Sequence, residues 1–158
     1  EEHFPTDLMA ENVPAFLAEL KAQPLLDSLK SGEGLLTSDT VVVMNDRILQ
    51  KPKDRDEAIR MLQTLSGEMN KVVTGVCLHS IHEKKVFSSE TKVYFNKLRE
   101  EDIIYYVDKY QPFDKAGAYG IQEWIGQIGV SHIEGCFYNV MGLPVHQVWE
   151  YLHQIEVK

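Results

Sequence analysis

The feature that most restricts the fold of this chain is a pair of β-rich runs near its middle. Residues 71–82, KVVTGVCLHSIH, and residues 85–95, KVFSSETKVYF, are rich in β-branched and, in the second run, aromatic side chains, and the charged turn 83–85 joins them. Two such runs separated by a short polar segment predict a β-hairpin. The chain is therefore expected to contain one long antiparallel hairpin.

Helical and strand patterns alternate on both sides of this hairpin. Asn12 and Pro14 mark the start of a helix, which Pro24 is expected to kink or split. Asp54 and Glu57 form the capping box of a second helix. Periodicity and turn residues further predict a strand at 35–44 with a turn at 45–46 and a short return strand, helices at 99–112 and 145–155, and a strand at 135–144.

This mixture of strands and helices predicts an α/β fold. The chain has 158 residues, which is enough for one domain with a sizeable core, and it shows no internal repeat, low-complexity segment or linker. We therefore expect residues 1–158 to form a single domain.

Charge and cysteine usage narrow the possible partners and compartment. The formal net charge is -8, whereas a protein that binds a nucleic-acid backbone usually presents a basic face. No apolar run is long enough to cross a bilayer, and no signal peptide is visible after the first residue, Glu1. Cys77 and Cys136 lie in apolar segments, where two reduced core thiols are favoured over a disulfide or a reactive thiol. These features fit a cytoplasmic protein with neither a nucleic acid nor a membrane as its partner.

Charged residues at the ends of predicted strands are the first candidates for function. Asp39, followed by Thr40, stands at the entry to the apolar run 41–43, where a carboxylate is either a solvated residue or a base or metal ligand. Lys51 precedes Pro52, which stiffens the chain and can aim the ammonium group. A solvent-facing lysine before a helix is the alternative, and position alone leaves both interpretations open.

The segment 112–124, PFDKAGAYGIQEW, places charges beside a backbone rich in small residues. Gly117 and Gly120 would let the backbone approach a ligand closely, and Lys115 would neutralise a phosphate as a point charge. Gln122 can both donate and accept hydrogen bonds, as the reading of a base edge requires. A glycine-rich turn after a helix is the alternative. No Walker loop or dinucleotide-binding glycine fingerprint occurs.

Taken together, residues 38–78, 100–122 and 133–145, with the earlier FLAELKA at 16–22, resemble the Maf family of nucleoside triphosphate pyrophosphatases. The series DTVVV, KP, LSG and VVTGV, followed by DKAGAYGIQ, carries the resemblance in the family's order. The form GAYGIQ is similar to the subgroup that acts on dTTP and UTP, and differs from the subgroup that acts on methylated GTP.

The resemblance implies a three-layer α/β/α fold around a long mixed β-sheet, similar to inosine triphosphate pyrophosphatases. It implies hydrolysis of nucleoside triphosphates to the monophosphate and pyrophosphate, which clears non-standard or surplus nucleotides. A divalent metal cation, Mg²⁺ or Mn²⁺, is the expected cofactor. Many members are cytoplasmic homodimers, so a homodimer is expected here.

The family's functional residues carry over position by position. Asp39 matches the proton acceptor, and Thr40 and Gln122 match positions tied to base selection. The resemblance further identifies three pocket lysines and one metal-site acid, which are Lys21 in LAELKA, Lys51 in the KP element, Lys115 in DKAG and Glu2 in EEHFP. Asp39 and Glu2 would together contact the metal.

The chain also departs from the family pattern. The family opens with a strand and a phosphate-gripping S-x-S-P-R-R loop, and this sequence begins after the point where that loop would end. Its arginines would clamp a triphosphate. Their absence is the feature that favours a second hypothesis, in which the chain is a nucleotide- or partner-binding module with little catalysis that acts in cell division and septum formation. Pyrophosphate release separates the two hypotheses.

Overall fold

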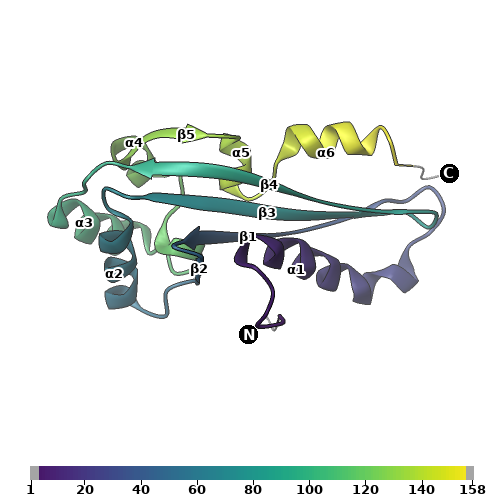
Figure 1. Ribbon diagram of the computed structural model, residues 1–158, viewed down its shortest axis with the longest axis horizontal. Coiled ribbons are helices and arrows are strands. Elements are labelled where there is room, and N and C mark those ends of the chain that lie inside the picture. The colour runs from purple at the N-terminus through teal and green to yellow at the C-terminus, as the bar shows by residue number, and fades with distance from the viewer. Residues whose placement is uncertain (1–3, 156–158) are drawn as a thin grey trace.

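A five-stranded sheet runs through the computed structural model, which describes residues 4–155 (Figure 1). The strands lie in the order β2-β1-β3-β4-β5. Their bounds are β1 Leu35–Met44, β2 Arg47–Leu49, β3 Met69–His79, β4 Lys84–Phe95 and β5 Val130–Glu134. The α/β class expected from the sequence is confirmed.

The predicted hairpin forms the centre of this sheet. β3 and β4 pair without a break from Met69 opposite Tyr94 to His79 opposite Lys84, and the pair extends along the molecule (Figure 1). A second hairpin joins β1 to β2 through Asn45 and Asp46, whose φ angles are 50° and 59°. Asn and Asp tolerate this left-handed region better than other residues with a side chain, so the turn predicted at these two residues is also confirmed.

The helices alternate with the strands along the chain. Their bounds are α1 Val13–Ala22, α2 Arg55–Leu65, α3 Glu100–Tyr110, α4 Trp124–Gly129, α5 Phe137–Met141 and α6 Val145–Leu152, with 3-10 turns η1 Ala10–Asn12, η2 Gln23–Ser28 and η3 Ala116–Ala118. The change from α1 to η2 occurs next to Pro24, as expected from a proline that interrupts a helix. No helix among residues 4–155 is long and apolar enough to span a membrane.

Successive side chains of a strand point to opposite faces of the sheet, and each face packs against a different layer of helices. Val41 and Val43 of β1 pack with Leu17 of α1, while Val42 between them packs with Leu62 of α2 in a separate core. The core on the α2 side also contains Ile103, Tyr106 and Val107 of α3, and Val148 of α6 covers the far end of β3 at Val76 and Leu78. Helices therefore cover both faces of the sheet, which gives the three layers that were expected.

The sheet differs from the expectation in one respect. All four strand pairings among residues 4–155 are antiparallel, whereas the family resemblance implied a mixed sheet. Short turns link β1 to β2 and β3 to β4, and such turns reverse the chain direction.

The strand predicted at 135–144 is wrong, because residues 137–141 form α5 and the last strand, β5, lies just before it. Asn139 explains the difference. Its side chain is fully buried, and its Nδ2 donates to the Val72 carbonyl oxygen at 3.2 Å and to Thr91 Oγ1 at 2.8 Å. These contacts to two strands outweigh the local β propensity of the sequence FYNVM. They hold α5 against the sheet, where its end borders the candidate site.

Candidate active site

A cleft of about 1000 Å³ opens beside β1. Among the described residues, β2 covers only Val42–Met44 of β1, and residues 38–41 on the uncovered part of that edge line the cleft. The other walls come from Phe4 and Thr6, α1, β2 with the β2–α2 connection, residues 114–122 and the end of α5. Because a strand edge is open to both faces of the sheet, Asp39 and Thr40 reach the same cleft although successive side chains point in opposite directions.

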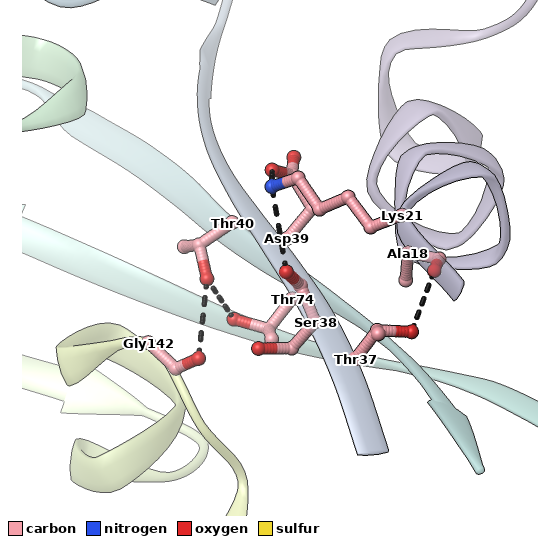
Figure 2. Close-up of polar contacts among 8 residues, drawn as sticks. All are labelled: Ala18, Lys21, Thr37, Ser38, Asp39, Thr40, Thr74 and Gly142. Carbon is pink, nitrogen blue, oxygen red and sulfur yellow. Dashed lines mark hydrogen bonds and ion pairs between the residues drawn. The ribbon is translucent and has the colours of Figure 1, made fainter. Parts of the chain in front are cut away.

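Asp39 and Lys21 form an ion pair on the α1 side of the cleft (Figure 2). Lys21 Nζ donates to Asp39 Oδ1 at 2.5 Å and to the Ser38 carbonyl oxygen at 3.5 Å. Thr37 Oγ1 donates to the Ala18 carbonyl oxygen at 2.6 Å and so fixes α1 beside this strand. The Asp39 side chain is only 9% exposed. A carboxylate held in this way can accept a proton from water or bind a cation.

Thr40 lies on the opposite face, against Thr74 and α5 (Figure 2). The Thr40 and Thr74 hydroxyl oxygens are 2.8 Å apart, and Thr40 also reaches the Gly142 carbonyl oxygen at 3.4 Å. Thr74 can in turn donate to the Asn139 carbonyl oxygen at 3.2 Å. The hydrogen of Thr40 thus has protein acceptors within reach, which leaves its oxygen able to accept a hydrogen bond from a ligand.

Positive charge collects in the cleft of an otherwise acidic protein. Among residues 4–155, the charged residues of its lining are the four lysines Lys21, Lys51, Lys53 and Lys115 and the two aspartates Asp39 and Asp114. The whole chain carries a formal charge of -8. Such a local excess of ammonium groups favours a polyanionic ligand.

The Lys115 ammonium lies between two carboxylates. Its Nζ is 3.1 Å from Asp114 Oδ1 and 3.2 Å from Glu123 Oε1. Burial lowers the pKa of Lys115, but the hydrogen bonds to these two acids outweigh it, so its pKa lies above the ordinary value and the group is charged at neutral pH. The same contact with Lys115 holds the pKa of the Asp114 carboxyl below its usual value.

The loop that follows is more tightly packed than its composition suggested. Gly117 is buried and has a φ of 69°. Its N–H donates to the Gln50 carbonyl oxygen at 3.2 Å, and a Cβ added at Gly117 would lie 3.2 Å from a Val42 side-chain carbon. The left-handed backbone at Gly117 therefore serves packing against β1. Gly120 and the exposed Gln122 do border the cleft.

The structure brings most of the predicted site residues together. The cleft is lined by Lys21, Asp39, Thr40, Lys51, Lys115 and Gln122. Glu2 lies outside the described residues. The sequence did not indicate Lys53, Tyr119 or the wall formed by residues 140–142. Lys53 could have been found from the sequence, because it lies two residues after Lys51 in the segment KPK. The wall formed by residues 140–142 was missed because α5 was predicted as a strand.

The described lining of the cleft offers a divalent cation two carboxylates, those of Asp39 and Asp114. Among residues 4–155, no group of three or more His, Cys, Asp and Glu side chains could hold a metal ion. Mg²⁺ commonly takes one or two protein carboxylates and completes its shell with phosphate oxygens and water. Asp39 in a lysine-rich cleft fits that mode, in which a phosphorylated ligand supplies the remaining oxygens.

Cys77 and Cys136 are both free thiols, as predicted, and neither lines the cleft, but Cys136 is half-buried and not the core thiol that was expected. Cys77 is buried, and burial raises the pKa of its thiol. A raised pKa keeps this thiol protonated and unreactive at neutral pH.

Comparison with known proteins covers nearly the whole chain. Residues 1–155 match the family described as Maf-like protein. A dTTP/UTP pyrophosphatase of Bacteroides thetaiotaomicron is 46% identical over 155 residues, which are 98% of this chain and 80% of that protein. A dTTP/UTP pyrophosphatase of Porphyromonas gingivalis is 49% identical over 153 residues, or 96% of this chain and 77% of that protein. A protein of Christiangramia forsetii with the same name is 46% identical over 155 residues, 98% of this chain and 79% of its own length.

Proposed function

Because the chain belongs to the Maf family, we propose that it hydrolyses nucleoside triphosphates, dTTP and UTP foremost, to the monophosphate and pyrophosphate. The family resemblance extends the proposal to a divalent cation as cofactor and to a homodimer in the cytoplasm. One observation carries the proposal most directly. In the part of the chain that the structure describes, a single cleft contains the Asp39 carboxylate, four lysines and the polar pair Thr40 and Gln122.

The proposed reaction uses the polar side chains of the cleft in distinct roles. Asp39 orients a water molecule and takes its proton as the water oxygen bonds to the α-phosphorus. The bond between the α-phosphorus and the bridging oxygen breaks, and pyrophosphate leaves. Lys21 holds the Asp39 carboxylate in place, while Lys51 and Lys115 offset negative charge on the phosphate oxygens. A bound Mg²⁺ or Mn²⁺ would polarise the phosphate and lower the pKa of a bound water.

Base selection is proposed for the other part of the cleft, at Thr40 and Gln122. The Thr40 oxygen can accept a hydrogen bond, and the Gln122 amide can donate and accept. Thymine and uracil present an imide N–H between two carbonyl oxygens. To bind this edge, the protein needs an acceptor for the N–H and donors for the oxygens. This match supports dTTP and UTP as substrates.

Pyrophosphate release from a panel of nucleotides tests the proposal. We expect release with Mg²⁺ or Mn²⁺, faster from dTTP and UTP than from CTP, methylated GTP or inosine triphosphate, and we expect a chelator to abolish it. The intact mass of the sample should be recorded alongside. Absence of release from every nucleotide would contradict the enzymatic function and favour a nucleotide-binding module.

Gln122→Ala is expected to weaken the preference for dTTP and UTP. Loss of one or two neutral hydrogen bonds to the base should lower kcat/KM for dTTP about tenfold and change it little for inosine triphosphate. The matched control is Gln127→Ala, because Gln127 is also exposed but does not line the cleft. An equal loss with all nucleotides would show that Gln122 does not read the base.

A further inference from the structure

A chain of hydrogen bonds behind the cleft connects the core of the protein to Lys115. Tyr106 of α3 is fully buried, and its hydroxyl donates to Glu123 Oε2 at 2.7 Å. The other oxygen of the same carboxylate, Glu123 Oε1, lies 3.2 Å from Lys115 Nζ. The backbone N–H of Gly120 donates to the Tyr106 oxygen at 3.2 Å. The carboxylate of Glu123 thus joins a fixed group in the core to a charged group in the cleft.

We propose that Tyr106 and Glu123 are positioning residues that aim the Lys115 ammonium at the phosphates of the substrate. The inference rests on the proposed function, because it takes the ligand of the cleft to be a nucleoside triphosphate. Lys115 lines the cleft, whereas Tyr106 and Glu123 do not. Their effect on the reaction is therefore exerted through Lys115.

Burial makes this arrangement more rigid than an ordinary surface ion pair. The side chain of Lys115 is 24% exposed and that of Glu123 is 20% exposed, while the other acid near Lys115, Asp114, is 76% exposed. An exposed pair is held weakly and rearranges freely. The Glu123 carboxylate has a buried partner on its second oxygen, so it can fix a direction for the ammonium that Asp114 cannot.

The space around Gly120 supports the same inference. A Cβ at Gly120 would lie 3.0 Å from Lys115 Cε and 3.1 Å from Glu123 Oε1. The lysine stem and the carboxylate therefore pack directly against this backbone, and the Gly120 N–H binds the same Tyr106 hydroxyl. One small segment thus sets the position of all three groups.

Two single variants separate positioning from simple charge effects. Glu123→Gln removes a negative charge near the phosphates, and Tyr106→Phe removes only the hydroxyl. We expect both to lower kcat/KM for dTTP, Glu123→Gln by about tenfold, as for loss of one hydrogen bond to a charged group. The loss should appear mainly in KM, whereas a structural defect would lower kcat through a smaller folded fraction. Tyr105→Phe is the matched control, because its exposed hydroxyl contacts Lys109 on the same helix.

A double-mutant cycle then asks whether Glu123 acts through Lys115. In a Lys115→Ala background, Glu123→Gln should cause no further loss, because the group that it positions is gone. Independently of activity, NMR titration of ¹³C-labelled lysine side chains should show a lower pKa for Lys115 in Glu123→Gln than in the original protein. Additive losses in the cycle, or a rise in kcat/KM for Glu123→Gln, would overturn the proposal.

The two readouts keep this proposal separate from the proposed function. If the original protein releases no pyrophosphate from any nucleotide, the proposed function fails and the NMR titration alone decides. An unchanged Lys115 pKa in Glu123→Gln would then overturn the contact on which the positioning role rests, and a lowered pKa would support that contact.

Discussion

Asp39→Asn is expected to lower kcat for pyrophosphate release by about a thousandfold, the scale of a lost general base, while the protein stays folded. An amide has nearly the same shape as the carboxylate but cannot take a proton from the attacking water. It is also a poorer ligand for a divalent cation. Steady-state kinetics with dTTP at saturating Mg²⁺ would measure the loss.

The fold should survive this change because the partner of Asp39 remains solvated. The Lys21 side chain is 41% exposed, so its charge keeps contact with water when the carboxylate is removed. Asparagine also keeps the size of the nearly buried Asp39 side chain, and its Oδ1 can still accept a hydrogen bond from Lys21, so we expect a loss of about 1 kcal/mol in the free energy of unfolding. Circular dichroism and thermal unfolding should therefore resemble those of the original protein.

Asp46→Asn provides a matched control for the chemistry. Asp46 lies in the turn between β1 and β2 and does not line the cleft, and asparagine tolerates its left-handed backbone equally well. This variant should keep full activity. Wild-type turnover by Asp39→Asn would show that another group accepts the proton.

The central strands could be predicted because their signals are local. The run 35–44 and the hairpin that follows have β-branched residues and compact polar turns, and the structure has these strands close to the expected positions. Alternation also predicts that Asp39 and Thr40 leave opposite faces of β1. The short return strand was predicted as well, but that both side chains reach one cleft depends on how the distant segments 114–122 and 140–142 pack beside β1, which the sequence pattern did not reveal.

The parts that sequence reasoning missed depend on contacts between distant residues. Residues 137–141 have strand-like side chains, yet the buried amide of Asn139 binds two strands of the sheet and stabilises a helix instead. Tyr106 is one of the buried residues of α3. Its bond to Glu123 links residues that are 17 positions apart, and no local pattern signals such a pair.

Gly75→Ala adds one methyl group at the centre of the sheet. We expect it to lower the free energy of unfolding more than a methyl group added at any other position there. A Cβ at Gly75 would lie 2.1 Å from the Ala15 nitrogen and 2.3 Å from the Pro14 carbonyl carbon. These are backbone atoms of α1, which cannot rotate away as a side chain would. The helix must move off the sheet, and we expect a loss of about 3 kcal/mol, the upper end of typical overpacking costs.

The same change should also reduce activity of the folded fraction. Gly75 stands opposite Asp39 in the register of β1 and β3, and α1 carries Lys21 to that carboxylate. Displacement of α1 should therefore separate Lys21 from Asp39. Urea unfolding and kcat per folded molecule, measured below the unfolding transition, would report the two effects.

Two further variants determine whether the close approach of α1 is the cause. Gly32→Ala adds a methyl group where no atom lies within 4 Å, and its positive φ should cost only about 1 kcal/mol. Ala15→Gly should fail to rescue Gly75→Ala, because the nearest atoms belong to the backbone and remain in place. Two results would contradict direct packing of the α1 backbone on β3: a Gly75→Ala variant as stable as Gly32→Ala, or recovery of its stability by Ala15→Gly. Either result would also remove the reason that a glycine occupies the position opposite Asp39.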